Sequence, residues 1–322
     1  MREIGSFIEL ELPKGREWYK GDVGVARLNT GRAAIWHAFR LTGAKAIWIP
    51  YYQCETVREF LTKEAVGIKY YHQDKNFNPM DLTPTQNEAV LLVNYCGMMS
   101  QDRMRDLAKD YQNVIIDNCQ AFFCKPIEGA LNVYSCRKFI GVADGAYVIG
   151  KGSEQYVDEY PQCYSSDTAA FLLKRIEYGC EGKGYEARTI NEERVDGEDI
   201  MKMSPLTRAM LDGADYEHIM TKRRENFETA CELFSDINIL EPKRYYDDET
   251  VPMVYPLLVE DDGMLQRLLD AKHFQGHWWY YITQELPANT FEHWMSRYMI
   301  PITIDQRYGE EELRYVRSVI GK

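Results

Sequence analysis

The central part of the sequence, residues 113–150, reads NVIIDNCQAFFCKPIEGALNVYSCRKFIGVADGAYVIG. An apolar run over Val114–Ile116 ends at Asp117, and Gln120 follows three residues later. A second short apolar run leads into Ser135 and Lys138. Continuous β-branched runs that polar residues bound are typical of buried parallel strands. Since ligand chemistry gathers at the carboxyl ends of such strands, we expect Asp117 and Lys138 to lie at that edge of a sheet.

Two opposite charges at neighbouring strand ends have two interpretations. The first is a buried or peripheral ion pair, which is common in α/β proteins. The second is the pair that a pyridoxal phosphate (PLP) enzyme requires, in which Asp117 would face the pyridine nitrogen and Lys138 would form a Schiff base. These residues alone leave both interpretations open.

Composition excludes several classes of protein. The chain has 322 residues and 45% hydrophobic residues, enough for two domains or for one large domain with an appendage. A net charge of −12 argues against nucleic acid and anionic membranes as partners, although local cations and backbone amides can still bind a phosphorylated ligand. The N-terminus lacks the apolar core of a signal peptide, and no apolar run is long enough to span a bilayer. We therefore expect a cytoplasmic protein that acts on a small molecule.

Cysteine and histidine spacing gives no sign of a metal site. The eight cysteines form no CxxC pair, which is typical of reduced thiols in a cytosolic protein. His273, His277 and His293 are too irregularly spaced to form a metal site. The aromatic run over residues 277–281 is expected to pack in a small domain, or alternatively to line the mouth of a substrate site.

The N-terminal half alternates predicted strands and helices, which favours a doubly wound, mostly parallel sheet flanked by helices. Residues 6–12 alternate between apolar and polar side chains as a strand does, and we expect them to form an arm or an edge strand. Thr30 or Asn29 can cap the helix that follows, and Gly31 would let an anion approach its first-turn amides. The other expected elements are strands over 46–50, 66–71 and 89–95, and helices over 55–63 and 102–111.

The pattern changes after Gly150. Residues 151–203 show no sustained period and are expected to form a loop or lid. One long helical region over 204–234 would connect two domains. The remaining elements are a strand over 251–259, a helix over 261–271, a strand at 299–302 and a helix over 309–320, which together suggest a small α+β domain. We expect a large domain over 1–220 and a small C-terminal domain over 221–322.

Taken in order, the chain resembles the DegT/DnrJ/StrS family of sugar aminotransferases, which have the fold-type-I, aspartate aminotransferase-like architecture. The stretch from Asp117 to Ala121 is similar to the family's D-x-x-Q-A motif, and Ser135 to Lys138 is similar to the S-x-x-K form of its lysine motif. The similarity extends to four further segments: Leu28–Ala34, Ile47–Pro50, Met203–Leu206 with Arg223–Glu225, and Met299–Ile302.

The resemblance implies pyridoxal 5′-phosphate as the cofactor. Lys138 would be the Schiff-base lysine and Asp117 the partner of the pyridine nitrogen, so these two are the expected catalytic residues. The remaining cofactor-binding residues implied by the resemblance are Thr30, Gly31, Arg32 and Ser135 around the phosphate, Gln120 and Tyr52 at the ring, and Cys54 and Asn94 in family positions.

The chain departs from the family pattern in several places. Cys54 stands at the family's stacking position, where Tyr52 is the nearer aromatic, and Asn94 replaces a frequent histidine. Ile200, Met201 and Lys202 stand where the family has an asparagine that reaches the phosphate of the dimer partner.

The resemblance implies an aminotransferase that moves an amino group, with glutamate as donor, to a keto group of a nucleotide-linked sugar in polysaccharide biosynthesis. It also implies a homodimer. Two alternatives remain: a PLP lyase or dehydratase, against which Lys138 argues, and a degenerate binding or regulatory protein that kept the fold.

Overall fold

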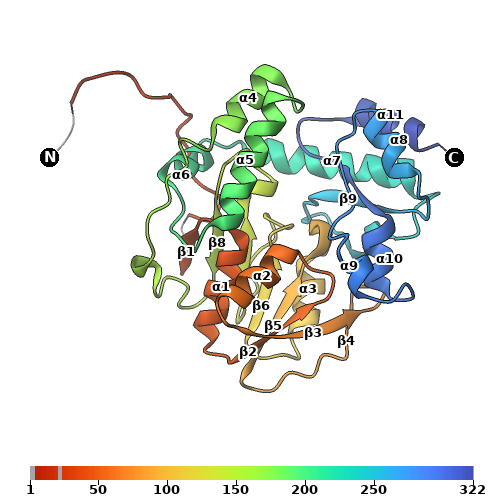
Figure 1. Cartoon of the computed structure of the whole chain (residues 1–322), viewed down its shortest axis with the longest axis horizontal. Coiled ribbons are helices and arrows are strands. Elements are labelled where there is room, and N and C mark those ends of the chain that lie inside the picture. The colour runs from red at the N-terminus through yellow and green to blue at the C-terminus, as the bar shows by residue number, and fades with distance from the viewer. Residues whose placement is uncertain (1–3, 21–23, 322) are drawn as a thin grey trace.

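A computed structural model describes residues 4–20 and 24–321 (Figure 1). Its centre is an eight-stranded sheet in the order β1-β8-β7-β6-β5-β2-β3-β4. The five strands from β7 to β3 run parallel, whereas β8, β1 and β4 are antiparallel to their neighbours. The strands of this sheet are β1 (Val25–Leu28), β2 (Ala46–Pro50), β3 (Gly67–Gln73), β4 (Pro79–Met80), β5 (Glu88–Val93), β6 (Val114–Asn118), β7 (Leu131–Ser135) and β8 (Ala146–Ile149).

The middle strands are buried on both faces, which explains why the sequence shows them as continuous apolar runs. Every residue of β5 and β6 is buried. Helices α1 (Gly31–Thr42) and α2 (Glu55–Lys63) cover one face, and α3 (Gln101–Ala108) contributes to the core on the other. The predicted mostly parallel α/β sheet is therefore confirmed.

Helix α1 begins where its capping residue predicts. The side chain of Thr30 accepts a hydrogen bond from the amide of Ala33 at 3.2 Å, and the helix ends at Gly43 in the left-handed conformation. The predicted helix over 55–63 and the predicted strand over 46–50 have the same bounds in the structure.

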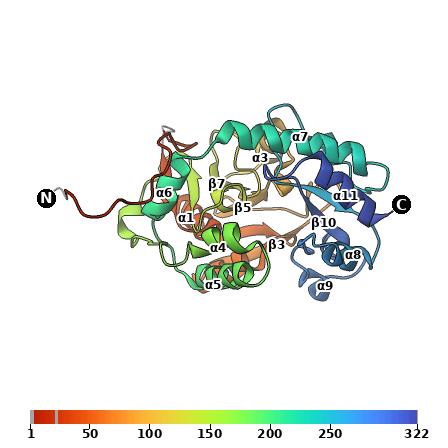
Figure 2. The ribbon, with the colours of Figure 1, turned by 90° about the horizontal axis from the view of Figure 1, so that it is seen from above.

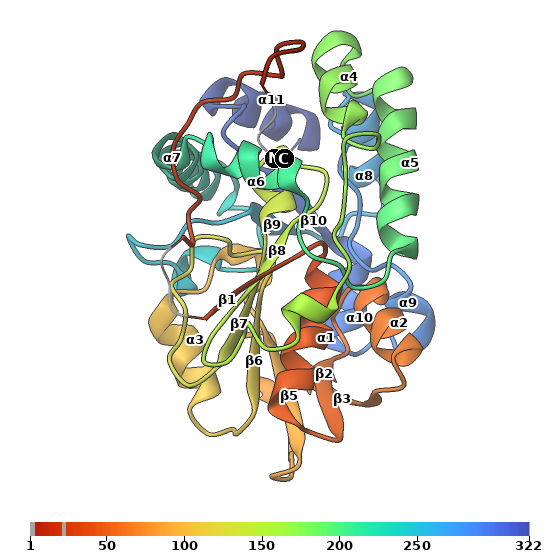
Figure 3. The ribbon, with the colours of Figure 1, turned by 90° about the vertical axis from the view of Figure 1, so that its left-hand side faces the viewer.

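Two segments differ from the sequence-based expectations in part or in full. Residues 6–12, expected to be an arm or an edge strand, form an arm and no strand, and Phe7, Ile8 and Leu10 are exposed, because the alternating pattern has no neighbouring strand with which to pair (Figure 1). Residues 151–203, expected to be a loop, contain the helical hairpin α4 (Ala170–Tyr178) and α5 (Lys183–Gly197) (Figure 3). The buried positions of α5 are Gly184, Ala187, Asn191 and Val195, so its sequence shows no clear apolar period, and α4 has no buried residue.

The predicted long helix over 204–234 consists of two helices. Helix α6 (Pro205–Asp212) ends at Gly213, and Asp215 caps α7 (Tyr216–Phe234) by accepting from the amide of His218 at 3.0 Å. Helix α7 runs along one side of the molecule between the large sheet and the C-terminal elements (Figure 2). It crosses the expected domain boundary at residue 220 without interruption, so this division stays a prediction.

The C-terminal part has the expected α+β composition. Strand β9 (Val254–Leu258) pairs antiparallel with β10 (Met299–Thr303). Its apolar residues form a third core cluster with those of α7. The remaining helices are α8 (Met264–Asp270), α9 (Ile282–Glu285), α10 (Phe291–Tyr298) and α11 (Glu310–Ile320). In the described ranges, none of the helices combines the length and apolar character that crossing a bilayer requires.

Candidate functional site

Asp117 lies at the carboxyl end of β6, as its position after an apolar run predicts. Its side chain is buried, and both carboxylate oxygens accept hydrogen bonds. Oδ1 accepts from the amide of Cys119 at 2.9 Å, and Oδ2 accepts from Nε2 of Gln53 at 3.2 Å. Because a carboxylate can accept about four hydrogen bonds, this one retains capacity for a further donor.

The start of helix α1 packs against the same edge of the sheet. A Cβ atom at Gly31 would lie 2.7 Å from Sγ of Cys119 and 3.8 Å from Cβ of Ser135. Only glycine fits this close approach without displacing the thiol. The first-turn amides of Gly31 and Arg32 have no acceptor within the helix, and the helix dipole favours an anion in front of them. The start of α1 and the ends of β6 and β7 therefore bring together four residues around Cys119: Thr30, Gly31, Ser135 and Asp117.

Lys138 ends the short 3₁₀ turn over Cys136–Lys138, directly after β7. It is exposed and lines a cavity of about 330 Å³. Three arginines line the same cavity: Arg137, Arg188 and Arg223. Its other lining residues are Gln120, Met253, Val254, Gln275, Trp278, Trp279, Thr303 and Asp305. A cavity with four cations and one carboxylate favours anionic ligands.

The two candidate catalytic residues have opposite effects on the pKa of the Cys119 thiol. Burial raises the pKa of this thiol, the Asp117 carboxylate raises that pKa further, and the Lys138 ammonium lowers it. The geometry of the sheet relates the same residues: Asp117 is in β6, which pairs in parallel with β7, and the turn that ends at Lys138 follows β7 directly. Asp117 and Lys138 therefore lie at the ends of neighbouring parallel strands, at the same edge of the sheet, as the strand-end argument predicts.

Arg223 reaches this site from helix α7. Its guanidinium donates to the carbonyl oxygens of Met253 at 2.8 Å and of Lys138 at 3.4 Å, and it lies 4.5 Å from the centre of the Phe139 ring. Burial lowers the pKa of Arg223 to about 10. The carbonyl of Phe139 accepts a further bond from Nε2 of Gln306 at 2.9 Å. Residues from the C-terminal part thus hold the backbone of the lysine turn.

Gln120 lines the cavity and is fixed at its amide oxygen, which accepts from the amide of Cys96 at 2.7 Å. Asn94 has a different environment. Its side chain pairs with the backbone amide and carbonyl of Met99, both at 3.1 Å, and so holds the loop after β5. Gly97 lies in this loop with a positive φ of 65°, and a Cβ there would lie 2.1 Å from the carbonyl oxygen of Gln120.

The other sequence-predicted residues do not line the cavity themselves, although Tyr52 contacts one residue that does. Arg32 is buried and pairs with Asp196 of α5 at 2.8 Å. Tyr52 packs edge-on to Trp279 with ring centres 4.5 Å apart. The sulfur of Cys54, the residue that precedes α2, lies 3.2 Å from the Thr56 hydroxyl. The cofactor roles of all the sequence-predicted site residues stay predictions.

Sequence reasoning missed several residues of the site, among them Gln53 and Arg188. Gln53 follows the strand that ends at Pro50, and a polar residue just after an apolar strand was the signal that could have found it. Arg188 comes from α5, whose sequence carries no apolar period, so nothing in the sequence pointed to it. Trp278 and Trp279 line the cavity, in agreement with the alternative interpretation of the aromatic run. Within residues 4–20 and 24–321, no group of three or more His, Cys, Asp or Glu side chains could hold a metal ion.

Comparison with known proteins gives matches to solved structures alone. No protein-family model matches the sequence, and no curated protein matches it. Among solved structures, the chain matches GDP-4-keto-6-deoxy-D-mannose-3-dehydratase from E. coli with bound hydrated PLP. The TM-score is 0.63 and the identity 13%, over 93% of this chain and 88% of the other.

Two aminotransferase structures match over a similar extent. The sugar aminotransferase CalS13 from Micromonospora echinospora gives a TM-score of 0.59 at 17% identity, over 93% of this chain and 87% of that chain. A DegT DnrJ EryC1 StrS aminotransferase from Brucella abortus gives 0.61 at 13% identity, over 94% and 88%. The chain therefore has the fold of the DegT/DnrJ/EryC1/StrS-type sugar aminotransferases, which is the fold that the sequence resemblance implied.

Proposed function

We propose that this chain is a PLP-dependent aminotransferase that transfers an amino group from an amino acid, with glutamate as donor, to the keto group of a nucleotide-linked sugar. The observation that carries the proposal is that one edge of the sheet holds Asp117, the start of helix α1 and the turn that ends at Lys138. The sugar aminotransferases and the PLP-bound dehydratase that share the fold support it.

The donor set at this edge of the sheet fits the cofactor. The amides of Gly31 and Arg32, the dipole of α1 and the Ser135 hydroxyl suit a phosphate group. Asp117 retains acceptor capacity for the pyridine nitrogen. Lys138 would hold the cofactor through Nζ. When bound, the cofactor supplies an electron sink that makes the proton next to the amino group acidic.

The residues of the cavity would then have separate roles in proton transfer and in substrate binding. Lys138 Nζ would remove and return the proton of the amino donor, because it is the exposed amine at the edge of the cavity. Arg137, Arg188 and Arg223 would attract the carboxylates of the donor and the phosphates of a nucleotide-linked acceptor. Trp278 and Trp279 offer apolar surface for a sugar or base.

A dehydratase acting on a similar sugar is the second candidate, because one of the matched structures is such an enzyme. In the family that the sequence resembles, the dehydratase reaction accompanies loss of the lysine, whereas this chain has Lys138. Lys138 therefore favours the aminotransferase. The third candidate, a binding protein without turnover, rests on the departures at Cys54 and Asn94.

Cofactor loading followed by amino-donor addition tests these candidates. Purified protein is mixed with PLP, and the visible absorption band of lysine-bound cofactor is recorded before and after addition of L-glutamate. An aminotransferase gives a band that disappears as the cofactor takes up the amino group. Lys138→Ala abolishes the band, whereas the control Lys243→Ala, an exposed lysine paired with Glu228, retains it. A band that no amino donor changes would favour the binding protein, and a wild type without a band would contradict the proposal.

The proposal includes a homodimer in the cytoplasm. The arm at residues 4–12 and the α4–α5 hairpin carry exposed apolar side chains that a second copy could cover, including Phe7, Ile8, Leu173 and Ile176. Sedimentation equilibrium of the full chain, which has a mass of 37.6 kDa, is expected to give twice that mass. The mass of a single chain at micromolar concentration would contradict the dimer.

A further inference from the structure

Gln53 has its amide fixed at both ends. Its Oε1 accepts from the backbone amide of Cys54 at 2.8 Å, which turns Nε2 toward Asp117, where it donates to Oδ2 at 3.2 Å. The side chain is 3% exposed. Since the acceptor end is already used, the orientation of the amide follows from the backbone, and the donor faces the carboxylate.

A second set of contacts holds Gln53 from the C-terminal part of the chain. The hydroxyl of Tyr281 donates to the carbonyl oxygen of Gln53 at 2.7 Å. Arg58 lies with its guanidinium 4.7 Å from the centre of the Tyr281 ring, and it donates to both carboxylate oxygens of Glu285 at 2.7 and 3.0 Å. Burial raises the pKa of Tyr281, which keeps its hydroxyl protonated as a donor.

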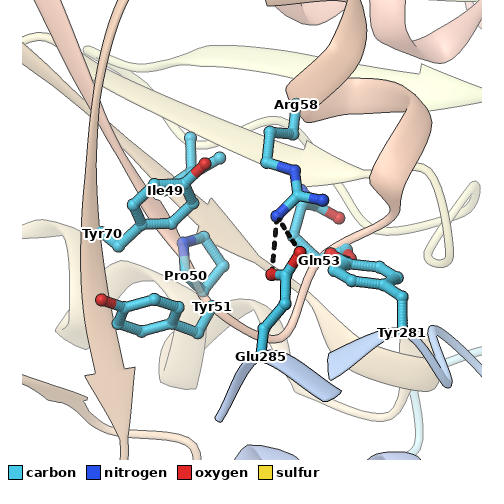
Figure 4. A pocket seen from close by; sticks show the side chains of 8 residues that line it. All are labelled: Ile49, Pro50, Tyr51, Gln53, Arg58, Tyr70, Tyr281 and Glu285. Atoms are coloured by element: carbon cyan, nitrogen blue, oxygen red, sulfur yellow. Dashed lines mark hydrogen bonds and ion pairs between the residues drawn. The ribbon is translucent and has the colours of Figure 1, made fainter. Parts of the chain in front are cut away.

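These residues surround a cavity of about 100 Å³, separate from the one that Lys138 lines (Figure 4). Tyr51 and Tyr70 form the opposite wall, with stacked rings 4.9 Å apart. The Arg58–Glu285 pair joins α2 to α9 across the cavity, so the segment that follows β2 is held between the large sheet and the C-terminal elements.

We propose that Gln53 is a positioning residue for Asp117, and that Tyr281, with the Arg58–Glu285 pair, holds Gln53 in place. This inference rests on the proposed function, because it concerns the carboxylate that would face the pyridine nitrogen. With Cys119 and Gln53 each donating to one oxygen, the carboxylate plane is fixed and its remaining acceptor sites point in set directions. A cofactor ring nitrogen would meet a preorganised acceptor, which lowers the cost of binding.

The test compares PLP with its carbocyclic analogue, in which a carbon atom replaces the ring nitrogen. Dissociation constants of both compounds are measured by fluorescence titration of the apoprotein. In Gln53→Met, the affinity for PLP is expected to fall about tenfold, because the carboxylate loses one fixed donor. The affinity for the analogue is expected to change less than about twofold, since the analogue has no nitrogen to face Asp117. Gln53→Glu keeps the acceptor for Cys54 and places a like charge beside Asp117, so its loss of PLP affinity should be larger.

Two phenols of the small cavity provide a matched pair. Tyr281→Phe removes the bond to the Gln53 carbonyl and is expected to weaken PLP about threefold, with the analogue unaffected. Tyr51→Phe changes the opposite wall and is expected to leave both dissociation constants unchanged. If the Gln53 variants lost equal affinity for PLP and for the analogue, the inference about Gln53 would be overturned, while the proposed function would stand. A wild type that binds neither compound would overturn the proposed function and the inference with it.

Discussion

The buried carboxylate of Asp144 accepts hydrogen bonds from the hydroxyl and the backbone amide of Ser204, at 2.6 and 2.8 Å. The hydroxyl of Thr207 donates to it as well, at 2.5 Å. Ser204 also caps α6 by accepting from the amide of Thr207 at 3.1 Å. Asp144 therefore ties the loop after Lys138 to the start of α6. This contact gives a physical reason for the Ser204-Pro205 helix start that the sequence shows.

Asp144→Asn is expected to lower the free energy of unfolding by about 2–3 kcal/mol, because one amide oxygen cannot replace two carboxylate oxygens for three donors. Urea denaturation at neutral pH measures the change. Asp158→Asn, at an exposed position, is the control and should change stability by less than about 0.5 kcal/mol. Equal effects of the two substitutions would contradict the role given to Asp144.

Adjacent arginines on α7 provide a second comparison. Arg223→Met removes the buried donors to the carbonyls of Met253 and Lys138 and should cost about 2–4 kcal/mol of unfolding free energy. Arg224→Met removes bonds to the carbonyls of Glu249 and Thr250, which solvent can replace, and should cost less than about 1 kcal/mol.

Arg223→Lys should recover little of the stability that Arg223→Met loses, because an ammonium cannot reproduce the several directed hydrogen bonds of the guanidinium. Denaturation of the four proteins checks the order of stability. A lysine variant as stable as the wild type would show that charge alone matters at this position.

Much of the sheet edge could be predicted from the sequence, because strand ends and helix caps are local features. The apolar run before Asp117, the turn after Ser135 and the cap at Thr30 each follow from neighbouring residues. The parallel pairing of β6 and β7 then brings Asp117 and Lys138 to one edge.

The rest depends on tertiary contacts that no local pattern encodes. Gln53 meets Asp117 across 64 positions of sequence, and Arg188 reaches the cavity from a helix whose apolar period is weak. The ion pair of Arg32 with Asp196 on α5 could not be predicted for the same reason. The arm at residues 6–12 has the alternation of a strand, but a strand also requires a neighbour, and a single chain's pattern does not supply one.

Gly145 is expected to tolerate no side chain. Its φ is +121°, and a Cβ there would lie 2.4 Å from Sγ of Cys136 and 3.0 Å from Cγ2 of Thr207. Gly145→Ala should therefore cost about 2–4 kcal/mol, the sum of backbone strain and a clash in a packed region. Gly129→Ala is the matched control, since Gly129 has a φ of +84° with open space around it, and only the strain of about 1–2 kcal/mol applies. Equal losses in thermal denaturation would show that packing at Gly145 contributes nothing.

His37 is expected to make stability fall in mild acid. In helix α1 its Nε2 donates to the carbonyl of Ser153 and its Nδ1 accepts from the hydroxyl of Tyr160, both at 2.8 Å, so the neutral ring has both nitrogens satisfied. Burial lowers the pKa of His37 below its usual 6.5, and the nearby Arg40 guanidinium lowers it further, against a raising effect of the Ser153 carbonyl. The unfolded chain therefore takes up a proton at a higher pH than the folded chain. The contribution of His37 to the free energy of unfolding is fully present above about pH 6.5 and declines as the pH falls below this value.

His37→Gln separates this contribution from the rest, because an amide can also donate to Ser153 and accept from Tyr160 but does not titrate. Urea unfolding at pH 7, 6 and 5 is expected to show a smaller loss of stability in the variant than in the wild type. Burial also lowers the pKa of His273 and of His277, so the variant should keep part of the pH dependence. Parallel pH profiles for variant and wild type would mean that His37 takes up its proton equally in the folded and unfolded chains, which its closed set of hydrogen bonds argues against.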